Sequence, residues 1–240
     1  MTADSRNRIA LVTGGAGQLG RYVVERLQEV GASPHVPIFR EDEGGELRDF
    51  LGSDAQEVRF HRNGDLTDPG TVASLFETIR SEEGVGPEIV LNLAGGFAMA
   101  PVEETEPEMW ARMWQMNATT AFLVSRAAFA EMKERGWGRI VNVSAFPALD
   151  RGQDGLSAYG AAKAGVLNLT HTLAREGVDH GITVNAVLPS IIDTAANREA
   201  MPDADTSSWI HPREIARVIS FLVSEDARTV NGAAIPLTLG

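Results

Sequence analysis

Short apolar runs alternate with longer stretches of helical periodicity along most of this chain. Four of the runs are apolar on both faces, which is typical of strands that have helices on both sides. These four runs are Ile9–Thr13, Ile89–Ala94, Ile140–Ser144 and Ile182–Leu188. Two weaker strand candidates, His35–Phe39 and Glu57–His61, lie between the first run and the second.

The segments between these runs have the periodicity of helices. We expect helices over residues 18–30, 68–83, 107–134 and 157–178. A further helix should begin after His211, because Pro212 suits a first helical position and Glu214 suits a first turn. Parallel neighbouring strands need crossover connections, so this succession predicts an α/β fold with a doubly wound parallel sheet and helices on both faces.

A single domain accounts for the whole chain, residues 1–240. That length can bury one large core, and no repeat or long Ser/Pro/Gly linker divides it. The least regular part is Ile191–Ser208, which is polar, rich in alanine and near the expected carboxyl ends of the strands. We interpret it as a mobile lid or as a plain surface loop.

Composition narrows the classes of function. The formal net charge is −12 and the basic residues are scattered, which argues against a nucleic-acid partner. Without cysteine there is no disulfide or thiolate site, and the five histidines never fall at i,i+4 spacing, so no metal site is indicated. No apolar run approaches the roughly 18 residues of a membrane span, and the polar start lacks a secretory segment, so we expect a cytoplasmic protein.

A glycine-rich loop, Thr13-Gly-Gly-Ala-Gly-Gln-Leu-Gly20, follows the first strand and opens a helix. Gly14, Gly17 and Gly20 permit a tight turn, close approach to a pyrophosphate and close helix–strand contact. The phosphate would then lie on a helix N-terminus, beside the backbone of Gln18 and Leu19. The loop predicts a dinucleotide site, and a purely structural turn is the alternative.

The end of the second strand normally selects between the two nicotinamide dinucleotides. Arg40 stands there and would accommodate a ribose 2′-phosphate, which favours NADP over NAD slightly. Glu41 or Asp42 would instead bind a 2′-hydroxyl if the strand ends one residue later.

Two further strand ends offer candidate cofactor-binding residues. Asp65, followed by Leu66, is placed to accept a hydrogen bond from the adenine amino group, whereas Asp68 before Pro69 suits a helix cap. Small residues end the fourth strand in Asn92-Leu-Ala-Gly-Gly96, where Asn92, Ala94 and Gly95 would let a ligand cross the strand ends or would simply form a turn.

The candidate chemistry centres on Tyr159 and Lys163, which are four residues apart and share one face of a helix. A lysine cation near a phenol favours phenolate and so lowers the phenol's pKa. A tyrosine so placed transfers protons near neutral pH. Asn117 would join a proton relay through a backbone carbonyl and a water. An amphipathic helix with an exposed lysine is the alternative.

Six ordered motifs together resemble the short-chain dehydrogenase/reductase family. They are Thr13–Gly20, Asp65, Asn92–Gly95, Asn117, Tyr159-x-x-x-Lys163 and Asn185-x-x-x-Pro189. The resemblance implies a Rossmann-type domain in which residues 8–100 mainly bind NAD or NADP, with Tyr159, Lys163 and Pro189 also near the cofactor. It implies hydride transfer to or from a small-molecule substrate, with residues 101–240 carrying the catalytic side, and a homodimer or homotetramer.

One departure from the family pattern bears on the substrate. Alignment from the strand places Ala145 where the family's substrate-binding serine stands, and alignment back from Tyr159 lands on Phe146. Ser144 is the nearby hydroxyl, but strand alternation turns neighbours to opposite faces, so a bulge would be needed for it to act.

Alanine at this place locally resembles the dihydropteridine reductase branch, whose acceptor is a quinonoid ring. We therefore expect a carbonyl, quinone or quinonoid substrate. The alternative is a catalytically weak nucleotide-binding regulator or redox sensor on the same fold, which the missing serine favours and the intact Tyr159, Lys163 and Asn117 oppose.

Overall fold

The structure is a computed structural model, and it describes residues 7–239 except 41, 63, 150 and 151. Within these residues, seven parallel strands form one sheet in the order β3-β2-β1-β4-β5-β6-β7. The strands are β1 (Ile9–Thr13), β2 (Ser33–Pro37), β3 (Arg59–His61), β4 (Ile89–Asn92), β5 (Gly138–Val143), β6 (Ile182–Pro189) and β7 (Ala234–Leu237). The predicted parallel α/β fold is confirmed.

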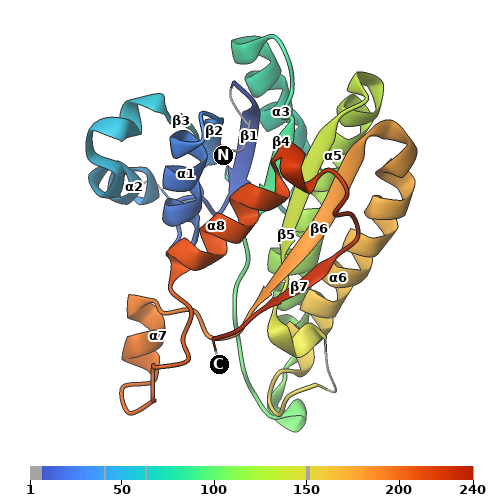
Figure 1. Ribbon diagram of the computed structural model, residues 1–240. Helices are drawn as coiled ribbons and strands as arrows, with labels where there is room; N and C mark the ends of the chain where they lie inside the picture. The colour runs from blue at the N-terminus through green and yellow to red at the C-terminus, as the bar shows by residue number, and fades with distance from the viewer. Residues whose placement is uncertain (1–6, 41, 63, 150–151, 240) are drawn as a thin grey trace.

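Helices cover both faces of the sheet (Figure 1). On one face lie α1 (Gly20–Glu29), α2 (Glu43–Leu51) and α8 (Pro212–Leu222). On the other face lie α3 (Pro69–Glu83), α5 (Thr120–Arg135) and α6 (Ser157–Gly177). Short α4 (Pro107–Met113) and α7 (Ala195–Ala200) and several 3-10 turns complete the described chain.

Strand β1 shows why the strand runs are apolar throughout. Ala10 and Val12 pack into the core beneath α1 and α8, whereas Ile9 and Leu11 pack into the core beneath α3 and α5. Alternate residues of one strand therefore enter two different cores, as strand geometry requires. Both faces exclude water, which favours apolar side chains on both.

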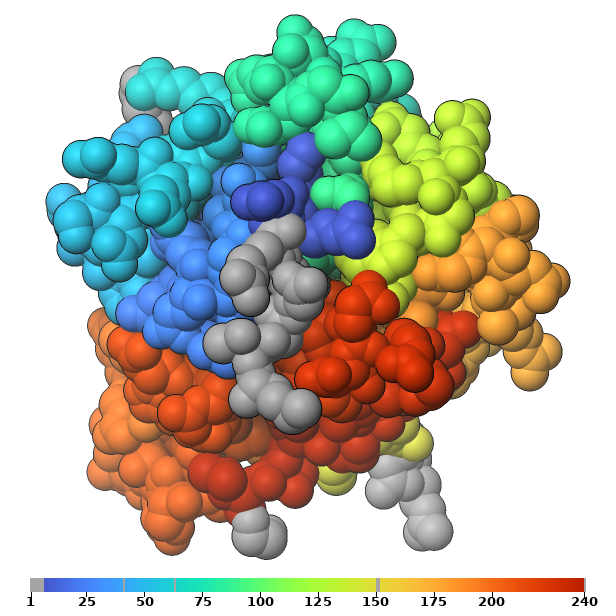
Figure 2. Space-filling view, turned by 45° about the horizontal axis from the view of Figure 1, so that its top comes forward, coloured from blue at the N-terminus to red at the C-terminus, as the bar shows by residue number. Residues whose placement is uncertain are grey.

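The N-terminal and C-terminal parts of the chain are joined through α1 and α8, which lie side by side (Figures 1 and 2). Arg213 Nη1 of α8 lies 2.8 Å from Glu25 Oε2 of α1. Arg26 Nε of α1 donates a hydrogen bond of 3.2 Å to Ser220 Oγ of α8. The helix that follows the glycine loop is thus held by residues almost two hundred positions later.

The expected helix over residues 107–134 is interrupted. A π-helical turn, Trp114–Thr119, separates α4 from α5. The side chain of Asn117 lies in this turn and donates a 2.9 Å hydrogen bond to the carbonyl oxygen of Met113. Single π turns inside helices are frequent at functional sites. The periodicity of the sequence gave no sign of this interruption.

Three elements were absent from the sequence-based prediction. Helix α2 begins with Glu43-Gly44-Gly45, whose glycines disfavour a helix. Strand β7 contains Pro236, which an edge strand tolerates. Helix α7 is only six residues long. Among the described residues, no helix has both the length and the apolar character needed to cross a membrane.

Candidate active site

A cavity of about 650 Å³ opens at the carboxyl ends of β5 and β6. Its walls are mainly apolar, and its larger apolar side chains are Phe97, Met99, Phe146, Leu156, Ile191 and Met201. Tyr159 and Lys163 also line it. The sheet therefore places Tyr159, the predicted proton donor, and Lys163, its predicted partner, at the wall of a ligand-sized space.

Tyr159 and Lys163 share one face of α6, as their spacing predicted. Lys163 is 6% exposed, and its ammonium donates a 2.8 Å hydrogen bond to the carbonyl oxygen of Val143 at the end of β5. Lys163 Nζ lies 5.8 Å from the centre of the Tyr159 ring. Phe97 contacts the same ring edge-on, with the ring centres 5.0 Å apart.

Burial governs the protonation of both groups in the protein alone. It raises the pKa of Tyr159 to about 12 and lowers the pKa of Lys163 to about 8. We expected Lys163 to lower the pKa of the phenol, and the structure shows a shift in the opposite direction. Desolvation of the phenol outweighs the attraction of a lysine that is itself desolvated.

Asn117 fastens the loop after β4 to the π turn. Its side-chain amide donates a 3.1 Å hydrogen bond to the carbonyl oxygen of Gly96, and its Oδ1 accepts a 3.3 Å hydrogen bond from the backbone amide of Gly96. A Cβ on Gly95 would stand 2.5 Å from Asn117 Oδ1 and 3.5 Å from Lys163 Nζ. Gly95 must therefore be small so that the asparagine and the lysine can approach the same loop.

Ser144 lines the cavity, but its hydroxyl is bound to the helix that carries Tyr159. Ser144 is 2% exposed, and its Oγ donates 2.8 Å to the carbonyl oxygen of Lys163 on α6. Its neighbour Ala145 lines the cavity and presents only a methyl group there. Strand alternation predicted this orientation. Ser144, a candidate catalytic residue by sequence, instead fixes β5 to the helix that carries Tyr159.

The glycine loop leaves the N-terminus of α1 open. Gly14 adopts φ +66°, and a Cβ on Gly20 would stand within 2.1 Å of the carbonyl oxygen of Gly14, so neither position accepts a side chain. No side chain caps α1 and no acidic residue stands in its first turn. The backbone amides near Gln18 and Leu19 therefore lie at an uncapped helix N-terminus, where they can bind an anion.

Two buried side chains hold the strand ends around this loop. Thr13 Oγ1 accepts 3.1 Å hydrogen bonds from the amides of Leu93 and Ala94. Asn92 is 4% exposed, and its amide donates to Ser125 and to Asn142. The side chain of Asn92 thus anchors β4, and it acts on the predicted cofactor site through the position of the strand.

The residues expected to select the nucleotide lie at the surface beyond β2. Arg40 Nε donates 3.2 Å to Asp42 Oδ1, and Arg40 Nη1 lies 3.7 Å from Glu43 Oε1. These carboxylates raise the pKa of Arg40, with the hydrogen bond to Asp42 the largest cause. Glu41, the other residue considered for a ribose hydroxyl, lies outside the described residues.

Of Asp65 and Asp68, it is Asp68 that caps a helix, as expected. Asp68 caps α3 by accepting from the amides of Gly70 and Thr71. Asp65 is exposed and accepts 2.8 Å from the amide of Thr67, next to half-buried Leu66. The Asp65 carboxylate keeps an oxygen at the end of β3, where an adenine amino group was predicted to bind.

The segment Ile191–Ser208 forms part of the cavity wall. Pro189 ends β6, and Ile191, Asn197 and Met201 line the same cavity. Thr194 caps α7, and Arg198 Nε lies 2.6 Å from Asp193 Oδ1. Residues of this segment therefore form part of the cavity wall, a position that both a lid and a surface loop could occupy.

Comparisons with known proteins agree with this geometry. The family model described as short chain dehydrogenase matches residues 8–205. An acetoacetyl-CoA reductase of Rhizobium meliloti (strain 1021) is 32% identical over 95% of this chain and 96% of its own length. The 3-oxoacyl-(acyl-carrier-protein) reductase FabG of Vibrio cholerae is 30% identical over 97% of this chain and 96% of its own.

This chain belongs to the short-chain dehydrogenase family. Among solved structures, a short chain dehydrogenase of Bacillus anthracis superposes with a TM-score of 0.85 at 26% identity, covering 96% of this chain and 94% of that one. The chain is an NAD(P)-dependent oxidoreductase of this family with a Rossmann-type sheet. The local resemblance to dihydropteridine reductase is not supported by these relatives, which act on acyl thioesters by their names.

The described residues fit the dinucleotide that short-chain dehydrogenases use. The uncapped end of α1 would hold the pyrophosphate, and the loop of Ala94 and Gly95 leaves room beside it. Arg40 and Asp65 stand at the ends of β2 and β3, on the adenosine side. Lys163 and Tyr159 stand on the opposite side, at the cavity.

Proposed function

We propose that this short-chain dehydrogenase reduces an apolar, conjugated carbonyl compound of the quinone or quinonoid type. One observation carries the proposal: the cavity offers the phenol of Tyr159 but only a methyl group at Ala145, while the hydroxyl of Ser144 is bound to the carbonyl oxygen of Lys163. An ordinary ketone develops a localised alkoxide that gains from a second hydrogen-bond donor. A quinonoid acceptor spreads the charge over its ring and needs that donor less.

The cavity lining supports a flat apolar substrate. Phe97 is 64% exposed and Phe146 is 40% exposed, and both stand at the cavity. Large aromatic surfaces left open to water favour stacking with a planar ligand. The Phe97 ring already meets Tyr159 edge-on, so a planar acceptor beside Phe97 would lie within reach of the phenol.

Each residue of the site has a definable part in the reaction. The bound nicotinamide supplies the hydride. Tyr159 donates a proton to the acceptor oxygen as that oxygen gains charge. Lys163, whose ammonium donates to the Val143 carbonyl in the protein alone, would hold the cofactor ribose and favour the proton transfer of Tyr159. Asn117 keeps the loop of Gly95 and Gly96 fixed beside them.

A substrate panel tests the proposal. Steady-state kcat/KM is measured with simple ketones, 3-oxoacyl thioesters, quinones and quinonoid pterins. We expect the quinone or quinonoid class to exceed the simple ketones at least about tenfold, equivalent to roughly 1.4 kcal/mol of transition-state stabilisation. In Ala145→Ser the added hydroxyl should raise the rate on simple ketones and narrow that gap.

Two other results would redirect the assignment. A preference for 3-oxoacyl thioesters would contradict the proposal. It would mean that this chain acts on the compounds that appear in the names of its relatives. Tight nucleotide binding without turnover on any compound would favour the regulator or redox sensor, which the alanine at position 145 also suits.

We further propose that NADPH binds more tightly than NADH. The support is Arg40 at the end of β2, with 61% of its side chain exposed. The carboxylates of Asp42 and Glu43 compete for the guanidinium, so the preference should be modest. Calorimetry should show that Arg40→Ala lowers the affinity for NADPH about tenfold and leaves the affinity for NADH unchanged. A charge-assisted hydrogen bond contributes roughly 1.5–3 kcal/mol. Equal affinities in the unmodified protein contradict this.

We also propose that the protein assembles as a homodimer or homotetramer. Trp110 in α4, Met116 in the π turn and Phe122 in α5 are 44%, 38% and 47% exposed, so large apolar side chains along this segment are open to water. Light scattering should give twice or four times the chain mass, and Phe122→Glu should yield a monomer. A monomeric unmodified protein at micromolar concentration contradicts the proposal.

A further inference from the structure

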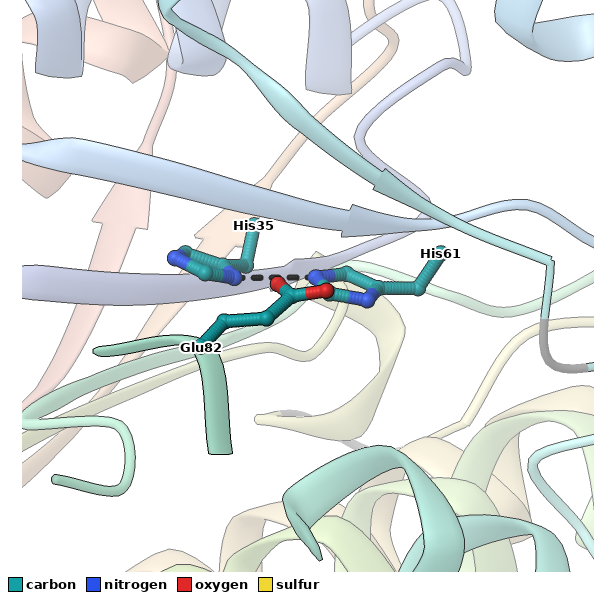
Figure 3. A group of neighbouring side chains, drawn as sticks. All are labelled: His35, His61 and Glu82. Atoms are coloured by element: carbon teal, nitrogen blue, oxygen red, sulfur yellow. Dashed lines mark hydrogen bonds between the residues drawn. The ribbon is translucent and has the colours of Figure 1, made fainter. Parts of the chain in front are cut away.

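A second buried cluster of titratable side chains lies away from the active site, between β2, β3 and α3. His35 and His61 are 0% and 5% exposed. In the strand register Pro37 pairs with His61, so His35 lies two residues earlier on the same face of the sheet. Glu82 approaches from the last turns of α3 beneath both rings (Figure 3). The cluster stands three strands away from β5 in the sheet order.

The two imidazole rings face each other through nitrogen atoms. His35 Nδ1 lies 2.9 Å from His61 Nε2, and the ring planes are 12° apart. One ligand atom from each of His35, His61 and Glu82 lies within 4.8 Å of the other two. Two imidazole nitrogens and a carboxylate oxygen form a donor set that Zn²⁺ binds.

The protons of two neutral rings do not satisfy this arrangement. Each neutral imidazole carries one N–H. If His35 Nδ1 donates to His61, then His35 Nε2 is a bare lone pair 3.4 Å from the carboxylate of Glu83, and it has no hydrogen-bond partner among the described residues. If His61 Nε2 donates instead, its Nδ1 is bare in the field of Glu82. In the first case a buried nitrogen has no partner among the described residues, and in the second a lone pair on His61 lies close to a carboxylate.

From this geometry we infer a binding site for a divalent transition-metal ion of the Zn²⁺ type, with His35 Nδ1, His61 Nε2 and the Glu82 carboxylate as ligands. The ion takes the place of the shared proton. Each ring then keeps its proton on the outer nitrogen, and His35 Nε2–H points to Glu83, the arrangement that orients metal-bound histidines. For tetrahedral Zn²⁺ the two facing nitrogens must separate from 2.9 Å to about 3.3 Å, and the two rings must tilt so that both lone pairs converge on the ion.

Charge and access favour the cation. Burial lowers the pKa of His35 to about 4 and also lowers the pKa of His61, a shift toward the neutral form of imidazole, which is the form that binds metals. Of the charges acting on the rings, the two carboxylates of Glu82 and Glu83 outnumber the guanidinium of Arg59. Glu82 is exposed, so the ion and a water as fourth ligand can enter beside α3. The ion would fasten the end of α3 to β2 and β3.

Metal titration of the full, tag-free chain tests this inference. Zn²⁺ binding is measured by calorimetry and by competition with a chromophoric chelator, and Co²⁺ reports the ligand geometry through its visible absorption. We expect one ion per chain, a tetrahedral Co²⁺ spectrum and a Zn²⁺-dependent rise in the unfolding temperature.

Three exposed or half-exposed glutamates of α3 provide matched variants. Glu82→Gln removes a ligand and should lower the affinity for Zn²⁺ more than tenfold. Glu83→Gln removes only the partner of His35 and should lower that affinity about tenfold. Glu77→Gln, on the same helix and exposed, should bind as the unmodified chain does. Absence of saturable binding overturns the inference. Equal affinity of Glu82→Gln and the unmodified chain also overturns it and indicates adventitious binding by other histidines.

Discussion

Two pairs of buried titratable residues, Tyr159 with Lys163 and His35 with His61, differ in what they face. Burial shifts the pKa of Tyr159, Lys163 and both histidines toward the neutral forms. Tyr159 and Lys163 line a cavity, so their protons can reach a substrate. The histidines face each other beneath α3. A displaced pKa alone therefore does not distinguish a proton-transfer site from a buried ligand cluster, and the space beside the group does.

The largest test of this contrast is Tyr159→Phe. Removing the phenol should lower kcat/KM about 10²–10⁴-fold, because the general acid is lost. NADPH affinity and Zn²⁺ affinity should both be unchanged. Initial rates with the best acceptor of the panel, together with calorimetry, measure all three. A fall of less than tenfold would mean that another group supplies the proton and that the cavity pair is not the catalytic one.

A second test uses the desolvation of Lys163. Its folded-state pKa of about 8 lies below the ordinary 10.5, so between these values the unfolded chain binds more protons and stability rises with pH. In the cofactor-free protein, Lys163→Met should therefore be more stable at pH 7 by on the order of 2 kcal/mol. This advantage should disappear as pH rises through 8 to 10.5. Urea unfolding at pH 7 and pH 10 measures it.

The chain offers a matched control for that test in its other lysine, Lys133 on α5, which is half-buried. Lys133→Met should show no comparable dependence on pH. If Lys163→Met is instead destabilising at pH 7 and remains so at pH 10, the hydrogen bond to Val143 outweighs the desolvation of the ammonium.

The smallest expected effect belongs to Ser144→Ala. The Ser144 hydroxyl is engaged by the carbonyl oxygen of Lys163 although Ser144 itself lines the cavity, so kcat/KM should fall by less than about tenfold. The variant should lose about 1 kcal/mol of stability instead, as a buried hydrogen bond is removed. Were Ser144→Ala as damaging to kcat/KM as Tyr159→Phe, Ser144 would be the family's serine and β5 would be aligned wrongly.

Much of the fold followed from the sequence because its signals are local. Continuous apolar runs marked the central strands, and the Pro212 start of α8 was correct. The missed elements have weak local signals: α2 begins with two glycines, and β7 carries a proline. The π turn around Asn117 depends on contacts with Gly96, twenty-one residues away, and no periodicity encodes such a contact.

The candidate site divides in the same way. The helical spacing of Tyr159 and Lys163 and the alternation that turns Ser144 from Ala145 are local geometry, and both agree with the structure. The direction of the Tyr159 pKa shift was wrong, because desolvation depends on tertiary packing. His35 and His61 are twenty-six residues apart, and only the pairing of β2 with β3 brings them together. The sequence offered one indication of this contact, namely that each histidine stands in a predicted strand at a position that can turn to the same face of the sheet.

The packing of α1 against α8 has a consequence for the order of events during synthesis. The helix that presents the phosphate-binding loop is completed at Glu29, yet the ion pair and hydrogen bond that hold it come from Arg213 and Ser220. A ribosome-bound chain therefore lacks this support until nearly all of the polypeptide has emerged. The loop expected to hold the nucleotide's phosphates is thus among the first parts to be synthesised and among the last to gain these contacts.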